Sequence, residues 1–188
     1  MPKVIPLYGS EYELAQAVQR GDAKAQNELY NKYAGKFMTI CLRYINDKMT
    51  AEDVMIQGIM RIFDKINQFN FAGSFEGWMK RIIVNEALMK IRTSKNFDVD
   101  IETIPDTGNE VDFSADLHAE DLLNLVSDLP VGYRTVFNLY AIEGYSHAEI
   151  ASQLQISEGT SKSQLSRARA ILQSKLQSLD SNFKKSIQ

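Results

Sequence analysis

The sequence predicts an all-α protein, in which two small helical domains are joined by an acidic flexible linker. Only 4 Pro and 10 Gly occur among 188 residues, and no stretch alternates apolar and polar residues with the period of two that is typical of strands. Apolar residues instead recur at helical spacing, and a Ser, Thr or Asp stands before most of these runs as a candidate N-cap. A hydrophobic content of 44% is typical of a globular protein.

The first domain is expected to hold helices over residues 11–20, 23–45, 51–67 and 75–93. Each has a capping residue or capping pair in front of it, namely Ser10 with Glu13, Asp22, Thr50 with Asp53, and Ser74. The second helix carries the apolar stripe Leu29, Tyr33, Phe37, Ile40, Cys41 and Tyr44. Five positions follow helical spacing in the fourth helix: Phe75, Trp78, Ile82, Asn85 and Met89.

A change in composition separates the domains. No Lys or Arg occurs between Lys95 and Arg134, and the interval carries Asp98, Asp100, Glu102, Asp106, Glu110, Asp112, Asp116, Glu120 and Asp121. Like charges repel and such a segment buries little surface, so residues 96–115 are predicted to be an acidic linker. The domains are therefore expected at residues 1–95 and 116–188.

The second domain ends in two helices joined by a tight turn. Pro130 suits the start of a helix over residues 131–142 that faces inward through Val136, Phe137 and Tyr140 and ends at Gly144. Ser146 and Glu149 form a capping box for a short helix, and after a turn at residues 155–156 Ser157 can cap a helix that continues to about residue 179. One face of that last helix carries Ser161, Leu165, Ala168 and Leu172.

The other face of the last helix suits DNA. It carries small or polar residues and cations, with Gly159, Ser163, Ser166, Arg167 and Ala170 on the outside and Lys162, Gln164 and Arg169 on the flanks. Small outward residues allow a helix to enter a major groove, where cations neutralise phosphates and contact bases. The pattern therefore predicts a DNA-binding helix-turn-helix. An ordinary pair of surface helices is the alternative.

A second nucleic-acid signal lies near the end of the first domain. Aromatic residues (Phe69, Phe71, Phe75 and Trp78) are mixed there with cations and an amide (Lys80, Arg81, Asn85, Lys90, Arg92 and Lys95). Rings stack on unpaired bases and cations follow the phosphates, as single-stranded nucleic acid requires. Trp78 is the ring that helical spacing assigns more readily to a core, whereas Phe69 and Phe71 are expected in a loop.

Other classes of protein find little support. A net charge of −3 places any DNA contact in local patches, and the single Cys41 excludes an internal disulfide and suits a reducing cytoplasm. Residues 1–10 lack the apolar core of a signal peptide, and no apolar run is long enough to span a membrane. His118 and His147 are far apart, and no glycine-rich phosphate loop occurs. We therefore expect no enzyme, no metal, no cofactor, no small-molecule substrate and no membrane insertion.

Taken together, these motifs resemble the extracytoplasmic-function (group IV) class of bacterial RNA polymerase sigma factors. The resemblance covers residues 25–93 and 122–177. In the first part the matching motifs are Ala51-Glu52-Asp53, Phe75 with Trp78 through Asn85, and Arg92. In the second they are Leu129-Pro130, Tyr133-Arg134, Glu143-Gly144, Glu149-Ile150-Ala151, the run from Ile156 to Thr160, Lys162-Ser163 and the run from Arg167 to Arg169.

The resemblance implies three binding surfaces and three partners, which are core RNA polymerase, promoter DNA and an anti-sigma factor. Core polymerase would bind Asp53 and Gln57. The promoter −10 element would be recognised and melted by Phe69, Phe71, Lys80, Arg81, Asn85, Lys90 and Arg92. The −35 element would be read by Lys162, Ser163, Gln164, Ser166, Arg167 and Arg169.

The sequence departs from the family pattern at several positions in or near these surfaces. Ile56 and Gln57 stand where many members have Gln and Glu, Met89 replaces a frequent Asp or Asn, Ser161 a buried Val, and Gln164 an Arg. A free-standing helix-turn-helix regulator that binds duplex DNA without polymerase is the alternative function. It shares the second domain but gives no reason for the aromatic and basic segment or the acidic linker.

Overall fold

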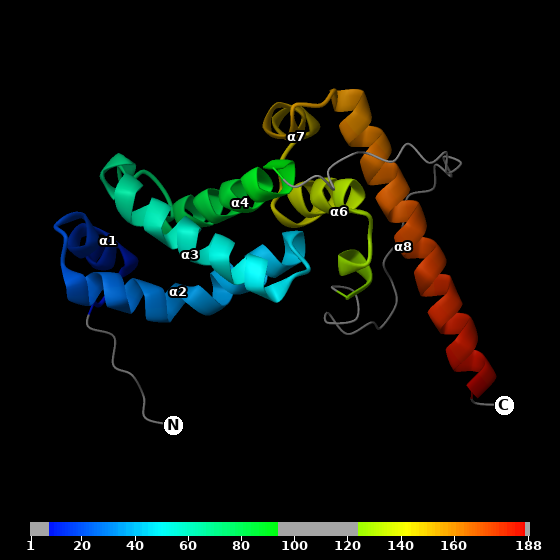
Figure 1. Cartoon of the computed structure of the whole chain (residues 1–188), viewed down its shortest axis with the longest axis horizontal. Helices are drawn as coiled ribbons and strands as arrows, with labels where there is room; N and C mark the ends of the chain where they lie inside the picture. Colours follow the sequence, from blue (N-terminus) through cyan, green and yellow to red (C-terminus); the bar gives the residue numbers. More distant parts are fainter. Residues whose placement is uncertain (1–7, 94–123, 187–188) are drawn as a thin grey trace. The chain divides into compact units, whose positions relative to one another are not determined.

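The protein is built from helices, and the computed structural model describes residues 8–93 and 124–186 (Figure 1). Contacts divide the chain into two units, Met1–Ile91 and Arg92–Gln188, which are described separately. No strand occurs within those two described ranges, which confirms the all-α prediction. The linker predicted at residues 96–115 lies outside them.

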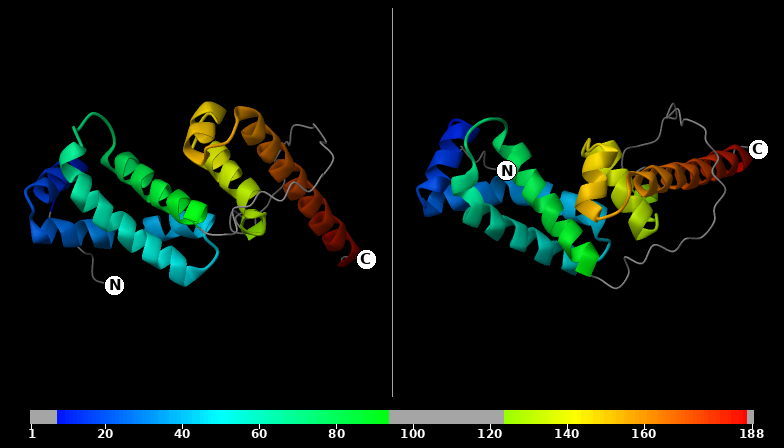
Figure 2. Two further views of the ribbon diagram at one scale, coloured as in Figure 1. Left: turned by 45° about the horizontal axis from the view of Figure 1, so that its top comes forward. Right: turned by 90° about the horizontal axis from the view of Figure 1, so that it is seen from above.

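Between residues 8 and 93, the described part of the first unit contains four α-helices and a short 3₁₀ turn: α1 Glu11–Gln19, α2 Ala23–Tyr44, α3 Lys48–Lys65, η1 Ile66–Gln68 and α4 Phe75–Thr93. Three predicted caps are confirmed, because the side chain of Ser10 accepts from the Glu13 amide, that of Asp22 from Lys24 and that of Ser74 from Gly77. All six residues of the predicted α2 stripe are buried. Figure 2 shows α2 and α3 as an antiparallel pair.

The start of α3 corrects the prediction. The helix begins at Lys48 instead of residue 51, and its N-cap is Asp47. The carboxylate of Asp47 accepts from the backbone nitrogen and the hydroxyl of Thr50, at 2.8 and 2.6 Å. These hydrogen bonds lower the pKa of Asp47. Asp53 therefore lies inside the helix and does not cap it, contrary to what the spacing predicted.

The buried face of α4 also differs from the expected stripe. Asn85 and Met89 are exposed and Trp78 is half-buried, although Phe75 and Ile82 are buried as expected. The remaining core positions of this helix are Met79, Ile83, Val84, Glu86, Ala87, Leu88 and Ile91. The side chains at positions 78, 85 and 89 therefore lie on one face of α4, and this face is directed toward solvent.

Helices α3 and α4 approach each other closely at Gly58. A Cβ added to this buried glycine would stand 2.5 Å from Cδ1 of Ile83 and 3.6 Å from its Cα. Only hydrogen fits at that position without displacing Ile83, so the glycine allows the two backbones to meet. An ion pair between Arg61 and Glu86, at 3.1 Å, connects the same helices.

The second unit contains α6 Val131–Phe137, the π-helical turn η3 Asn138–Ile142, α7 His147–Leu154 and α8 Glu158–Ser186. The capping box of Ser146 and Glu149 is present, and the Thr160 amide donates to the Ser157 hydroxyl at 2.9 Å. Gln155 joins α7 to the turn in the left-handed conformation, with φ of 57°. Helix α8 extends seven residues further than the expected end at residue 179 (Figure 1).

A π-helical turn replaces the end of the helix predicted over residues 131–142. The Glu143 amide donates to the Asn138 carbonyl at 3.0 Å, five residues back, and Gly144 ends the segment with φ of 78°. The wider turn carries Tyr140 outward, where the side chain is exposed. The expectation that Tyr140 faces the core was wrong, whereas Val136 and Phe137 are buried as predicted.

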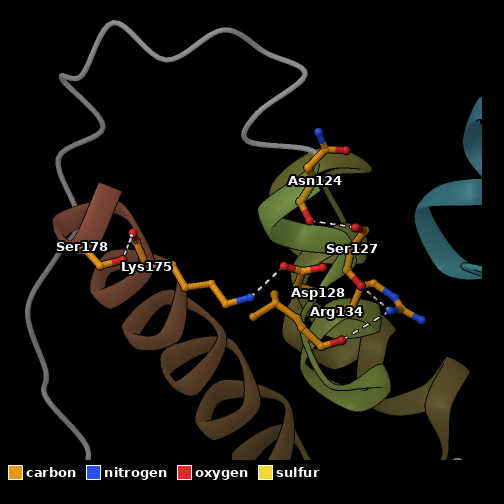
Figure 3. Close-up of polar contacts among 7 residues, drawn as sticks. Asn124, Ser127, Asp128, Arg134, Lys175 and Ser178 are labelled. Carbon is orange, nitrogen blue, oxygen red and sulfur yellow. Dashed lines mark hydrogen bonds and ion pairs between the residues drawn. The ribbon is translucent and has the colours of Figure 1, made fainter. Parts of the chain in front are cut away.

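Arg134 is buried and holds the segment that precedes α6. Its Nη1 donates to the carbonyls of Ser127 and Leu129, at 2.7 and 3.3 Å, and burial lowers the pKa of the guanidinium. Lys175 of α8 pairs with Asp128 of the same segment at 3.0 Å (Figure 3). Arg134 is therefore structural in this protein and connects the entry of the helix-turn-helix domain to α6.

Candidate nucleic-acid and polymerase interfaces

Helix α8 buries the face that the sequence predicts and leaves the cationic side accessible. Ser161, Leu165, Ala168 and Leu172 are each no more than 4% exposed. Lys162 and Ser163 are exposed, and Ser166, Arg167 and Arg169 are partly exposed. We call these last five residues the recognition surface. Its short serines and flanking cations match the needs of a helix that enters a DNA groove.

Gln164 lies outside this surface, contrary to the prediction. Its side chain is 2% exposed, and a Cβ added to Gly132 of α6 would stand 3.5 Å from its Nε2. Gln164 comes three residues after Ser161 and four before Ala168, so it borders the buried face, and α6 covers it. The amide therefore packs against α6 and is not accessible on the outward side of α8.

Five aromatic rings form a connected cluster at the loop between η1 and α4. The rings of Phe69 and Phe71 are 5.0 Å apart, Phe69 lies 5.0 Å from Phe75 and 5.5 Å from Trp78, and Phe71 lies 4.8 Å from Tyr12. Phe69 is 6% exposed, so its predicted contact with an unpaired base is wrong for this conformation. Its ring instead supports Phe71 and Trp78, which are partly exposed.

Two residues of α1 hold this loop, and the sequence pattern did not single them out. Nε2 of Gln19 donates to the carbonyls of Ile66 and Phe69, both at 3.0 Å, and Tyr12 packs on Phe71. Phe71 adopts φ of 60°, a left-handed conformation that is uncommon for a bulky residue. These contacts oppose that backbone strain, and they depend on tertiary packing that no local spacing records.

Five polar residues of α4 are predicted to contact the −10 element. Three of them lie on one face of the helix, and the other two, both lysines, lie elsewhere. Arg81, Asn85 and Arg92 recur at intervals of four and seven residues, are exposed, and share the solvent face with Trp78. Lys90 is exposed on another side of the helix, about two fifths of a turn or more from Arg81, Asn85 and Arg92 by helical geometry. We call Trp78, Arg81, Asn85 and Arg92 the α4 stripe.

Lys80 is separated from the α4 stripe by its ion pair. Its Nζ lies 3.0 Å from Glu76, which also pairs with Lys36 of α2 at 2.9 Å. The hydrogen bond from Lys36, followed by that from Lys80, lowers the pKa of Glu76. A phosphate that approached Lys80 would have to compete with this carboxylate, so Lys80 is a weaker anion site than its charge suggests.

The exposed side of α3 combines acidic and apolar residues. Asp53 and Gln57 are one turn apart and both exposed. Ile56 and Met60 beside them are 46% and 58% exposed, and Met49 is 74% exposed. Apolar side chains that recur on an exposed helical face are typical of a protein interface. We call Asp53, Ile56, Gln57 and Met60 the α3 face.

Other kinds of site receive no support from the described ranges. Among residues 8–93 and 124–186 no group of three or more His, Cys, Asp or Glu could hold a metal ion. Over the same described part of the chain, no helix is both apolar and long enough to cross a membrane. Burial raises the pKa of Cys41 to about 12, as expected for a packed thiol.

Comparisons with known proteins give a family match in each unit. The Sigma-70 region 2 family matches residues 29–97, and the Sigma-70 region 4 family matches residues 119–172. The RNA polymerase sigma-H factor of Pseudomonas aeruginosa is 27% identical, over 90% of this chain and 95% of that protein. The ECF sigma factor SigW of Bacillus subtilis is 27% identical over 86% of this chain and 94% of its own.

A solved structure has the same fold. CnrH, determined in complex with the cytosolic domain of CnrY, superposes with a TM-score of 0.50 at 20% identity, over 88% of this chain and 96% of that one. The match to region 2 accounts for the first unit, which a free-standing helix-turn-helix regulator leaves unexplained. The chain therefore belongs to the extracytoplasmic-function family of RNA polymerase sigma factors, promoter-specific initiation factors that bind the polymerase and are not a family of enzymes.

Proposed function

We propose that the three surfaces divide the work of initiation among them. Residues 1–95 dock on core polymerase through the α3 face and handle the −10 element through the aromatic cluster and the α4 stripe. Residues 116–188 read the −35 element with the recognition surface. The observation that carries the proposal is the two-sided nature of α8, whose buried Ser161, Leu165, Ala168 and Leu172 fix the orientation of its cations.

Within the recognition surface, Arg167 and Arg169 have different roles. Arg167 borders the outward serines and is long enough to reach a guanine edge, where a bidentate contact discriminates by about 1–3 kcal/mol. Arg169 lies on the flank beside Lys162, where it neutralises a phosphate. Lys162, Ser163 and Ser166 contact bases or phosphates in the same groove, whereas the buried Gln164 does not.

A library of −35 sequences, scored with holoenzyme at two salt concentrations, tests this assignment. Arg167→Ala should relax preference at one or two base positions. Arg169→Ala should weaken binding about equally across sequences and reduce the salt dependence by roughly one counterion. Gln164→Ala changes a buried residue of the same helix and is the control, because it should leave base preference unchanged. An unchanged preference with Arg167→Ala would show that the orientation of α8 in the groove is wrong.

At the −10 element, Phe71 and the α4 stripe capture unpaired bases. Extraction of a base costs a few kcal/mol of unstacking, which ring stacking and hydrogen bonds must offset. Phe71 is the partly exposed ring of the loop, and Asn85 offers both donors and acceptors beside Arg81 and Arg92. Phe69 and Lys80 act indirectly, through the aromatic cluster and the ion pair with Glu76.

Open-complex formation on duplex and pre-melted promoters separates melting from folding. Asn85→Ala should reduce open complexes on the duplex template, and a pre-melted bubble should restore part of the loss. Asn31→Ala removes a comparable exposed amide from α2, and it should have no effect on either template. An equal loss on both templates with Asn85→Ala would indicate a folding defect and refute the capture role.

Docking on core polymerase is assigned to the α3 face. Its exposed Ile56 and Met60 supply apolar area, and Asp53 supplies charge. Asp53→Lys should weaken core binding with the helix content unchanged, because Asp47 is the cap. Asp64→Lys makes the same charge change three turns along α3 and should have a much smaller effect. Equal losses would point to general charge repulsion rather than to this face.

An anti-sigma factor and a cytoplasmic location complete the proposal. RpoE of Bartonella quintana was solved in complex with the anti-sigma factor NepR, and it is 22% identical over 82% of this chain with a TM-score of 0.50. We expect this chain to have a partner of the same kind that blocks core binding, and to act where the polymerase is, in the cytoplasm. Purification of the crosslinked protein from its host should yield a partner that competes with core polymerase. If every crosslinked partner binds together with core, an inhibitor is excluded.

A further inference from the structure

Three segments of the helix-turn-helix meet at Tyr140. Its ring lies outside the core on the π-helical turn η3, and the ring of His147, the first residue of α7, stacks on it with centroids 4.6 Å apart and planes 21° apart. From α8, the guanidinium carbon of Arg169 stands 5.8 Å from the centre of the Tyr140 ring. The recognition surface is therefore connected through one side chain to both preceding segments.

Contacts with α8 and the backbone of η3 hold the two rings in place. Nδ1 of His147 lies 2.9 Å from the hydroxyl of Ser161, and Ser161 is fully buried. The hydrogen bond joins the start of α7 to α8 and sets the plane of the imidazole. The backbone of η3 positions Tyr140, because the additional residue in the π-helical turn places its ring outside the core. A rigid pair of rings thus lies beside Arg169.

The charge around this pair favours a neutral imidazole. Burial, together with the positive charges of Lys162 and Arg169, lowers the pKa of His147, and Glu158 acts in the opposite direction more weakly than burial or Lys162. A neutral ring does not repel the guanidinium. The face of Tyr140 attracts it, because the π-system of an aromatic ring is negative on its face.

We propose that Tyr140 and His147 form a platform that holds the Arg169 guanidinium ready for a backbone phosphate at the −35 element. Tyr140 is then a positioning residue for DNA binding. The inference rests on the proposed phosphate role of Arg169. Lys162 stands two turns earlier on the same flank of α8, so both cations face one DNA strand. An arginine that is ordered beforehand loses less side-chain entropy when it binds.

Promoter binding by holoenzyme, measured across salt concentrations with variants of Tyr140, tests the platform. Tyr140→Phe keeps the ring and should bind as the parent protein does. Tyr140→Leu removes the ring and should bind about two-fold to five-fold more weakly, the range expected for an exposed cation–π contact. The salt dependence should stay the same, because Arg169 keeps its charge. Tyr140→Met replaces Tyr140→Leu if the leucine variant fails to fold.

A second measurement separates positioning from a general structural role. In an Arg169→Ala background, Tyr140→Leu should cause no further loss, since there is no guanidinium to hold. Equal losses in both backgrounds would overturn the platform and leave the phosphate role of Arg169 intact. If Arg169→Ala itself leaves affinity and salt dependence unchanged, the proposed function of Arg169 fails, and the inference fails with it.

Discussion

The close approach of α3 and α4 makes Gly58→Ala a sharp test of the packing. Alanine is a better helix former than glycine by about 0.5–1 kcal/mol. At this position, however, the new methyl carbon would stand 2.5 Å from Cδ1 of Ile83. Ile83 is fully buried, so its methyl group can make room only by moving against the side chains packed around it. One atom of one neighbour thus decides whether the substitution stabilises the protein or destabilises it.

The size of the effect follows from these opposing contributions. An extra methyl in a packed core costs about 1–3 kcal/mol, which exceeds the gain in helix propensity. Gly58→Ala should therefore lower the free energy of unfolding by about 1–2 kcal/mol. Ile83→Val removes the offending carbon and alone costs about 0.5–1.5 kcal/mol. The new methyl would then meet the Ile83→Val side chain at ordinary distances, so in this background Gly58→Ala should stabilise by about 0.5–1 kcal/mol.

Urea unfolding of the four proteins in this cycle gives the answer. Trp78 is the only tryptophan of the chain and lies on α4, as Ile83 does, so its fluorescence follows the unit of interest. The predicted result is a change of sign between the two backgrounds. Additive free energies, or a Gly58→Ala protein more stable than its parent, would refute the close packing of α3 on α4.

Three further predictions concern helix ends and pH. Asp47→Ala should lower the free energy of unfolding by about 1 kcal/mol through loss of the cap, whereas Asp53→Ala should have little effect. Urea unfolding followed by Trp78 fluorescence compares the stabilities of the two variants. Gln155→Gly should raise stability by roughly 0.5–1 kcal/mol, since glycine adopts a positive φ without strain; an unchanged melting midpoint by circular dichroism would argue against that turn. Burial holds the pKa of His147 below its usual value of about 6.5, so the folded state prefers the neutral ring. The stability that His147 contributes in its neutral form is complete above about pH 6.5 and falls as the pH drops toward the lower pKa of the folded state. His147→Gln should accordingly lose less stability between pH 7.5 and pH 5 than the parent protein in urea titrations.

Local signals predicted most of the helices. The capping pairs Ser10 with Glu13 and Ser146 with Glu149 concern neighbouring residues, and the structure confirms both helix starts. The buried face of α8 was also predicted correctly, because its residues recur with the helical period and lie against one side of the core. They are Ser161, Leu165, Ala168 and Leu172. Spacing failed at the start of α3, where it indicated Thr50 with Asp53 as the capping pair. Asp47 and Thr50 both precede an apolar run, and only geometry shows that Asp47 is used.

Errors arose where tertiary packing decided the environment of a residue. Every residue from Tyr133 to Leu139 is buried, including the polar Arg134, Thr135 and Asn138, so the order of polar and apolar residues did not indicate the π-helical turn or the outward position of Tyr140. Gln164 looked like a DNA contact because its chemistry suits one, yet α6 covers it. Phe69 looked like a loop residue open to solvent, yet it fills the centre of a cluster that joins rings from different helices. No local spacing encodes such neighbours.

The bridge from Gln19 to the loop has a consequence for genetics. One amide on α1 holds two carbonyls, 47 and 50 residues further along the chain. Alleles that change Gln19 will therefore resemble lesions of the loop itself, with promoters that are bound but fail to open, although α1 carries no residue assigned to DNA. A second-site suppressor of such an allele is to be sought among loop residues that restore the backbone conformation at Phe71. Under the proposed function, residues that affect −10 activity should fall in two separate intervals of the sequence, which the hydrogen bonds of Gln19 join in the fold.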